Sequence, residues 1–150
     1  MSIHHNERLN AYQGATKHKA NTMGASGFAA VGIGAALGAW IRWGLGVFLN
    51  PVFATLPLGT LVANLVGGYL MGLAMGLMGT GSSLSPEMRV FITTGFLGGL
   101  TTFSAFSAEA VHLFSRGEYG WASAHVLSHV IGTLVMTGLG VLTVQLLRNG

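Results

Sequence analysis

Five ionisable side chains lie inside long apolar runs of this sequence, where a charged group is most costly to bury. They are Arg42, Glu109, His112, His125 and His129. An isolated carboxylate is not buried without a partner, so we expect Glu109 to be hydrogen-bonded by a hydroxyl, a water or a basic group. Its role can be functional or that of a structural anchor. The long side chain of Arg42 can extend toward an aqueous interface or serve a polar site.

Histidines and threonines in the last apolar run are spaced along one helical face. His125 and His129 are four residues apart and could face one metal ion, but such a site needs further ligands, and the sequence contains no Cys and no Asp. A metal site is therefore the less favoured interpretation. His129, Thr133 and Thr137 recur every four residues, which predicts a polar track along a helix. Threonines at this spacing also bond to carbonyls of their own helix, so both interpretations stay open.

The stretch GFLGGLTTFSAF at 95–106 places helix-weakening residues in apolar surroundings. A broken helix is tolerated in a membrane where its freed backbone lines a cavity or binds something. We expect the helix to unwind at Gly98-Gly99. Unwinding there would free carbonyls for a cation and would bring the amide donors of the next helical turn near the membrane centre.

Aromatic and amide groups around this break could meet an anion. Phe103 and Phe106 are three residues apart and share a helical face, and the electropositive edges of aromatic rings can contact a small anion. Asn64 supplies an amide with two donors, and Thr60 lies one turn before it. Taken alone, the two Phe residues would more simply indicate lipid contact or core packing.

The composition identifies the environment of these residues. Charged residues make up 7% of the 150 residues and the mean hydropathy is +0.60, whereas an average soluble domain has roughly 25% charged residues. The seven basic residues form no stripe that could neutralise several phosphates together, so we expect no nucleic-acid partner. The sequence predicts an all-α, multi-pass protein of the cell inner membrane or plasma membrane.

Four apolar runs are long enough to cross a bilayer as helices. We expect them over about 28–49, 58–78, 87–114 and 121–147, with the third helix broken around 95–102. Pro57 and the pair Ser85-Pro86 mark the starts of the second and third helices. Residues 1–26 are polar, and we expect a disordered N-terminal extension there, followed by one four-helix domain over 27–150.

Arginines and glycines indicate how the four helices assemble. Outside the extension, Arg89 and Arg148 fall on one side of the membrane and Arg42 and Arg116 on the other, so the positive-inside rule sets no orientation. Glycines spaced by four residues allow helix backbones to approach closely in lipid. The glycines spaced in this way are Gly34 with Gly38, and Gly68 with Gly72 and Gly76.

The chain from about Val31 to Leu147 resembles the Fluc/CrcB family of small fluoride ion channels. The matching motifs are GAALGAWIRWGLG (34–46), PLGTLVANLVGGYLMG (57–72) and, most specifically, TTGFLGGLTTFSAFSAE (93–109). The resemblance implies a passive, highly selective fluoride channel that exports fluoride without ATP, and no enzymatic activity. It also implies an antiparallel, dual-topology homodimer in membrane lipid, with two pores and a structural sodium ion at its centre.

The resemblance also assigns roles to individual residues. Backbone carbonyls of Gly98 and Thr101 from both subunits would hold the sodium ion. The fluoride path would be lined by Asn64, Phe103, Phe106, Thr133 and Thr137, with Thr60 and Glu109 along its inner part and Arg42 near the vestibule. Ala105 is a departure, because Thr is common between the two Phe residues.

Two other membrane functions compete with this interpretation. A small multidrug-type transporter depends on a carboxylate in its first helix, and the run 28–49 contains none. A non-transporting assembly subunit would need small residues for packing, but no Asn, Thr and Phe residues aligned along a path.

Overall fold

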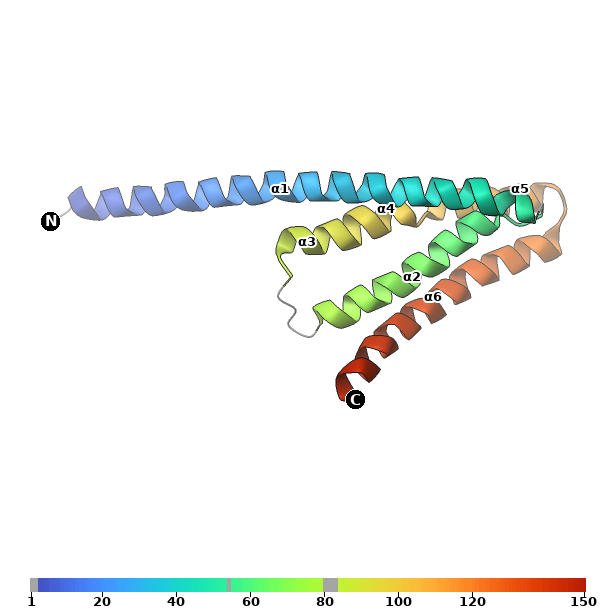
Figure 1. The fold of residues 1–150 in the computed structure, drawn as a ribbon. Coiled ribbons are helices and arrows are strands. Elements are labelled where there is room, and N and C mark those ends of the chain that lie inside the picture. Colours follow the sequence, from blue (N-terminus) through green and yellow to red (C-terminus); the bar gives the residue numbers. More distant parts are fainter. Residues whose placement is uncertain (1–2, 54, 80–83) are drawn as a thin grey trace.

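The computed structural model of this protein describes residues 3–53, 55–79 and 84–150, with side chains described from residue 24 onward. The described elements are helices that converge at one end of the molecule and diverge toward the other (Figure 1). In chain order they are α1 (Ile3–Leu49), the short η1 (Asn50–Val52), α2 (Leu58–Met78), α3 (Pro86–Val90), the π-helical η2 (Phe91–Leu97), α4 (Gly98–Leu100), α5 (Phe103–Ser115) and α6 (Tyr119–Asn149).

Within the described residues, four helical stretches are long and apolar enough to cross a membrane. They are Gly24–Val52, Leu58–Met78, Pro86–Ser115 and Tyr119–Asn149. The prediction of an all-α membrane protein is therefore confirmed. The predicted start of the third span is also correct, since the Ser85 side chain accepts a hydrogen bond from the amide of Met88 at 3.2 Å and Pro86 occupies the first turn.

Helix α1 is longer than the apolar run that the sequence predicted. It begins at Ile3, whereas we expected a disordered extension over residues 1–26. No proline occurs before Pro51, so nothing in the covalent backbone forces the helix to end where the sequence changes from apolar to polar. The membrane-compatible part of the helix begins at Gly24, close to the predicted boundary.

Glycine faces bring the helices into backbone contact, as their spacing predicted. A Cβ atom at Gly34 of α1 would lie 2.7 Å from the carbonyl oxygen of Phe91 in η2. A Cβ atom at Gly72 of α2 would lie 3.0 Å from the Cα of Gly140 in α6. Side chains at these positions would force the helices apart, so the glycines set the positions of α1 and α6 on either side of α2 and the third span.

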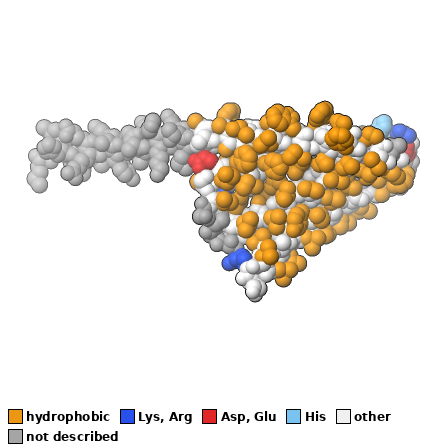
Figure 2. All heavy atoms as spheres, in the orientation of Figure 1, with side chains coloured by type: hydrophobic (Ala, Val, Ile, Leu, Met, Phe, Trp, Pro, Cys, Tyr) orange, Lys and Arg blue, Asp and Glu red, His pale blue; other side chains and the backbone are white. Residues whose placement is uncertain are grey.

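The buried core is small, and most large apolar side chains face outward. Its centre consists of Ala63, Leu97 and Leu100. Figure 2 shows hydrophobic side chains spread over the visible face of the four spans, with the charged groups near the ends. Trp40 and Trp43 of α1 are 68% and 71% exposed. A surface of this kind suits lipid or another protein in the membrane.

The third span is interrupted after α4. Thr101 and Thr102 have extended backbone conformations, and α5 begins at Phe103. The interruption therefore lies two to three residues beyond Gly98-Gly99, where we expected unwinding. Gly98 is helical, and a Cβ atom at Gly99 would lie 2.9 Å from the Cα of Ala35. The Gly99 position thus permits contact with α1 and does not itself unwind the helix.

Candidate functional site

Side chains bind several of the backbone groups that the interruption frees. The amide of Thr102 donates to Oδ1 of Asn64 at 2.8 Å, and Nδ2 of Asn64 donates to the carbonyl of Thr102 at 3.0 Å. Nε of Arg42 donates to the carbonyl of Gly99 at 3.0 Å. The Thr102 hydroxyl accepts from the amide of Ala105 at 3.2 Å and so caps α5. Asn64 of α2 thus holds the extended Thr102, and Arg42 of α1 holds the carbonyl of Gly99 just before the interruption.

A cavity of about 490 Å³ lies beside the interruption. Seven of the ten residues that the sequence assigned to a site line it, together with His129. The seven are Asn64, Gly98, Thr101, Phe103, Phe106, Thr133 and Thr137. The cavity therefore combines aromatic rings, threonines and an imidazole on one side of the helix break.

The two Phe rings lie close together at this cavity but differ in burial. Their centroids are 5.3 Å apart with an interplanar angle of 58°. Phe103 is 78% exposed, whereas Phe106 is 8% exposed. The Phe106 ring stacks on His125 at 5.4 Å and lies 4.8 Å from the ring of His129. Phe106 therefore packs against both histidines of α6.

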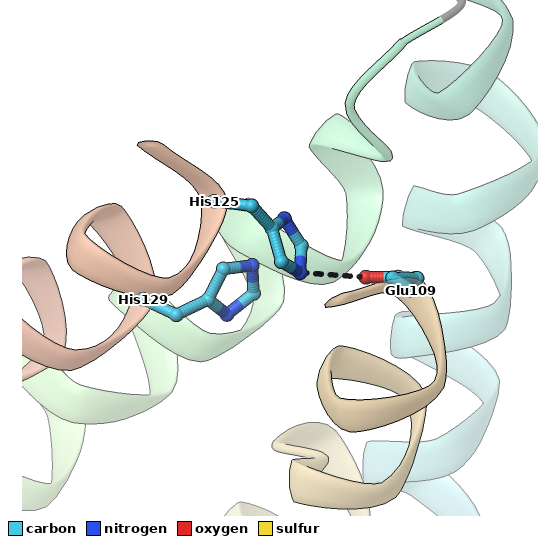
Figure 3. A group of neighbouring side chains, drawn as sticks. All are labelled: Glu109, His125 and His129. Carbon is cyan, nitrogen blue, oxygen red and sulfur yellow. Dashed lines mark ion pairs between the residues drawn. The ribbon is translucent and has the colours of Figure 1, made fainter. Parts of the chain in front are cut away.

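Thr60 and Glu109, which the resemblance places along the same part of the path, form a pair. The Thr60 hydroxyl donates to Oε1 of Glu109 at 2.6 Å. The other carboxyl oxygen, Oε2, lies 3.5 Å from Nε2 of His125 (Figure 3). The expectation that a hydroxyl or a basic group accompanies this carboxyl is therefore confirmed.

A polar cluster connects the first cavity to a second one. Glu109, His125 and His129 each place one polar atom within 4.8 Å of the others. His129 lines the first cavity, and Glu109 lines a second cavity of about 330 Å³ near the loop between α5 and α6, together with His112 and Arg116. The cluster thus lies where a polar route between the two cavities would run.

Thr137 of α6 makes the intrahelical bond that the sequence left open. The Thr137 hydroxyl donates to the carbonyl of Thr133 at 2.9 Å. Both residues nevertheless line the first cavity. A hydroxyl that donates to its own helix retains lone pairs but offers no hydrogen to an anion. The local bond and the polar track are therefore compatible, with the Thr137 hydrogen committed to the helix.

Sequence reasoning missed two parts of this site. The contact of Arg42 with the Gly99 carbonyl joins residues 57 positions apart, and no local sequence pattern predicts it. His129 was recognised as part of the α6 spacing but was not assigned to the site, although it lines the cavity. Its four-residue spacing from Thr133 was the available signal.

Comparison with known proteins identifies relatives along most of the chain. Residues 29–141 match the family model described as "CrcB-like protein, Camphor Resistance (CrcB)". A "Fluoride-specific ion channel FluC" of Nitrosospira multiformis is 58% identical over 127 residues, which are 85% of this chain and 99% of that protein. The protein of the same name from Cupriavidus pinatubonensis is 58% identical over 83% of this chain and 99% of its own length.

A relative from another genus matches over the same core. The "Fluoride-specific ion channel FluC" of Pseudomonas putida is 54% identical over 114 residues, which are 76% of this chain and 90% of that protein. The family match covers the second and third spans fully, the first span from residue 29 onward, and most of α6. This chain belongs to the CrcB-like family.

Proposed function

We propose that this protein is a passive, highly selective fluoride channel of the bacterial plasma membrane, which lowers cytoplasmic fluoride by export. One observation carries the proposal. The motif TTGFLGGLTTFSAFSAE, in a chain 58% identical to a protein named as a fluoride-specific ion channel, coincides with the helix interruption and its cavity. The protein acts as a channel and not as an enzyme.

The fluoride path follows the polar groups between the two cavities. Ions enter by the second cavity, pass Glu109 and Thr60, and reach the first cavity beside Phe106 and His129. Selectivity in such a path comes from its width and from the number of donors that replace water. Phe ring edges and N–H groups suit a small anion, whereas chloride is larger and more weakly hydrated and should be largely excluded.

The functional unit is a homodimer of antiparallel subunits. Phe103 lines the first cavity although its side chain is 78% exposed, so a second surface is needed to enclose that side of the path. The exposed apolar face of the spans offers such a surface. Equal numbers of arginines at the two ends of the core favour insertion in both orientations.

Backbone carbonyls of Gly98 and Thr101 from both subunits would hold a structural sodium ion at the centre of the dimer. In a continuous helix these carbonyls would accept from the amides of Thr102 and Ala105. Those amides instead donate to Asn64 Oδ1 and to Thr102 Oγ1. Oxygen-only ligation suits a hard cation. The redirected hydrogen bonds support the choice of these two carbonyls.

Fluoride efflux from liposomes tests the function. Liposomes containing the purified protein and loaded with fluoride should release it to an external fluoride electrode once potassium permeability is provided, and chloride-loaded liposomes should release little. A multidrug-type transporter or an assembly subunit would give no fluoride-specific efflux. Absence of efflux from protein that is folded and dimeric would overturn the proposal.

Gly98 gives a direct test of the dimer and its ion. Within one chain, a Cβ atom at Gly98 would meet only the Thr93 carbonyl at 3.9 Å, so Gly98→Ala fits an isolated subunit. We expect Gly98→Leu to weaken dimerisation and ion retention, while Thr101→Ser, which leaves the carbonyl in place, retains both. Cross-linking of cysteines near opposite ends of the spans should yield antiparallel pairs, and exclusively parallel pairs would contradict the dual topology.

A further inference from the structure

The side-chain amide of Asn64 has its orientation fixed by the backbone of a single residue. Its Oδ1 accepts from the Thr102 amide at 2.8 Å, and its Nδ2 donates to the Thr102 carbonyl at 3.0 Å. Exchanging the two amide atoms would place a donor against a donor and an acceptor against an acceptor. Nδ2 is therefore the atom that lies 3.1 Å from Nδ1 of His129.

This orientation determines where His129 carries its hydrogen. Nδ2 of Asn64 has two hydrogens, one for the Thr102 carbonyl and one for His129. Nδ1 of His129 must accept that second hydrogen with its lone pair. A neutral imidazole with a free lone pair on Nδ1 carries its hydrogen on Nε2. Protonation of both nitrogens would set two donors against each other across this 3.1 Å contact.

The resulting Nε2–H group is buried and available. His129 is 4% exposed, and its Nε2 atom has no hydrogen-bond partner among the residues that the structure describes. The residue lines the first cavity together with Phe106 and Thr133. A buried N–H donor without a partner is unfavourable, and an anion that reaches this atom from the cavity would satisfy it.

We propose that His129 is an anion-binding residue that donates Nε2–H to fluoride, and that Asn64 is the positioning residue that fixes its tautomer. The proposal rests on the fluoride-channel function proposed above. It changes the role expected for Asn64, because both hydrogens of its amide are used within the protein and neither is left for the ion. The chain of donors runs from the Thr102 backbone through Asn64 and His129 to the anion.

The same tautomer argues against a metal ion at the neighbouring cluster. Glu109, His125 and His129 lie within 4.8 Å of one another, but a histidine binds a metal through a lone pair. With Nδ1 occupied by Asn64 and a hydrogen on Nε2, His129 offers none. Within this cluster His129 therefore supplies a hydrogen-bond donor and no lone pair for a cation.

Two substitutions of His129 separate the donor from the contact with Asn64. Glutamine places an N–H group near the position of the histidine Nε2, whereas asparagine reaches only the position of Nδ1. We expect His129→Gln to retain fluoride efflux and His129→Asn to lower it by about tenfold or more, as expected for the loss of one hydrogen bond to a charged group. Equal efflux from these two folded, dimeric variants would contradict the donor role.

The tautomer can be observed without any measurement of flux. In protein labelled with ¹⁵N-histidine, the nitrogen spectrum should show His129 hydrogenated at Nε2, with that signal shifted by added fluoride and not by chloride. In Asn64→Asp the neighbouring atom becomes an acceptor, so the hydrogen should move to Nδ1. Asn50→Asp is the matched control, because the Asn50 side chain accepts from the Gly59 amide at 2.8 Å through an oxygen that Asp retains.

The outcomes distinguish this proposal from the function on which it rests. His129 found hydrogenated at Nδ1 or at both nitrogens in the wild-type protein would overturn the proposal even if efflux is normal. The expected tautomer in a protein that shows no efflux and no fluoride shift would overturn the fluoride-channel function and the anion role together. An unchanged tautomer in Asn64→Asp would remove Asn64 as the positioning residue.

Discussion

Helix α6 packs in two different ways along its length. Its C-terminal half meets α2 backbone to backbone, where a Cβ atom at Gly140 would lie 2.8 Å from the amide nitrogen of Leu73. Its N-terminal half meets α5 through rings, with Phe106 5.4 Å from His125 and 4.8 Å from His129. In the C-terminal half the two helix backbones touch at glycines. In the N-terminal half the contact between the helices is made by side-chain rings.

This difference separates the scaffold from the chemistry. A seam of glycines fixes the distance between two helices but offers no polar side chain to a ligand. The ring-packed half borders the first cavity through His129 and gathers a carboxyl and a second imidazole next to that residue. Substitutions at the seam glycines should therefore act on folding, and substitutions in the ring-packed, N-terminal half should act on fluoride flux.

The largest effect should come from a methyl group in the glycine seam. Gly140→Ala would press its Cβ against the backbone of Tyr69 and Leu73, and overpacking against backbone costs about 3 kcal/mol or more where neither helix can shift. We expect little folded dimer, measured by size-exclusion chromatography in detergent. Gly138→Ala is the matched control on the same helix, since its Cβ would meet nothing within 4 Å. Equal loss of folded protein in both variants would contradict the role of close backbone packing at Gly140.

Replacing a Phe ring should reduce flux with little effect on folding. Phe103→Ile and Phe106→Ile keep apolar bulk but delete the electropositive ring edge, and apolar substitutions of similar volume cost less than about 1.5 kcal/mol. We expect fluoride efflux from liposomes to fall by about tenfold or more, the effect of roughly 1.4 kcal/mol on a rate. Wild-type efflux from both variants, with the dimer intact, would show that these rings do not line the path.

A smaller effect is expected at the pair that joins the two cavities. Thr60→Val removes the 2.6 Å hydrogen bond to Glu109 and leaves the carboxyl short of a partner, at a cost of about 1–3 kcal/mol. Chemical denaturation should show the lower stability, and efflux should fall because the carboxyl is no longer held. Thr60→Ser keeps the hydroxyl and should restore most of both. A loss of the same size in Thr60→Ser would assign the effect to the methyl group instead.

Much of this structure could be predicted from the sequence because lipid imposes simple requirements. Apolar length gave the four spans, with Leu58–Met78 matching the predicted range and α6 starting two residues earlier than expected. Residues from three separate runs, among them Asn64, Phe106 and Thr133, were assigned to one site and line one cavity. The two Phe residues, and likewise Thr133 and Thr137, reach the same cavity because each pair lies within one helix at helical spacing.

The exact point of the helix break could not be predicted in the same way. Gly98 and Gly99 have the weakest helical preference in the segment, yet Thr101 and Thr102 are the extended residues. The outcome depends on Ala35, which requires Gly99 for close contact, and on Asn64, which binds the Thr102 backbone. Both partners lie far away in the sequence, so local preferences contain no information about them.

The hydrogen bonds between Asn64 and the Thr102 backbone have a consequence for how the protein inserts into the membrane. In lipid, an unpaired amide or carbonyl costs several kcal/mol. The backbone of the extended Thr102 would therefore be unfavourable in the bilayer until Asn64 binds its amide and carbonyl. The third span is also the least apolar of the four. Because α2 precedes it in the chain, the ribosome delivers Asn64 to the membrane first. The order of synthesis thus lets an earlier span act as an insertion partner for a later one.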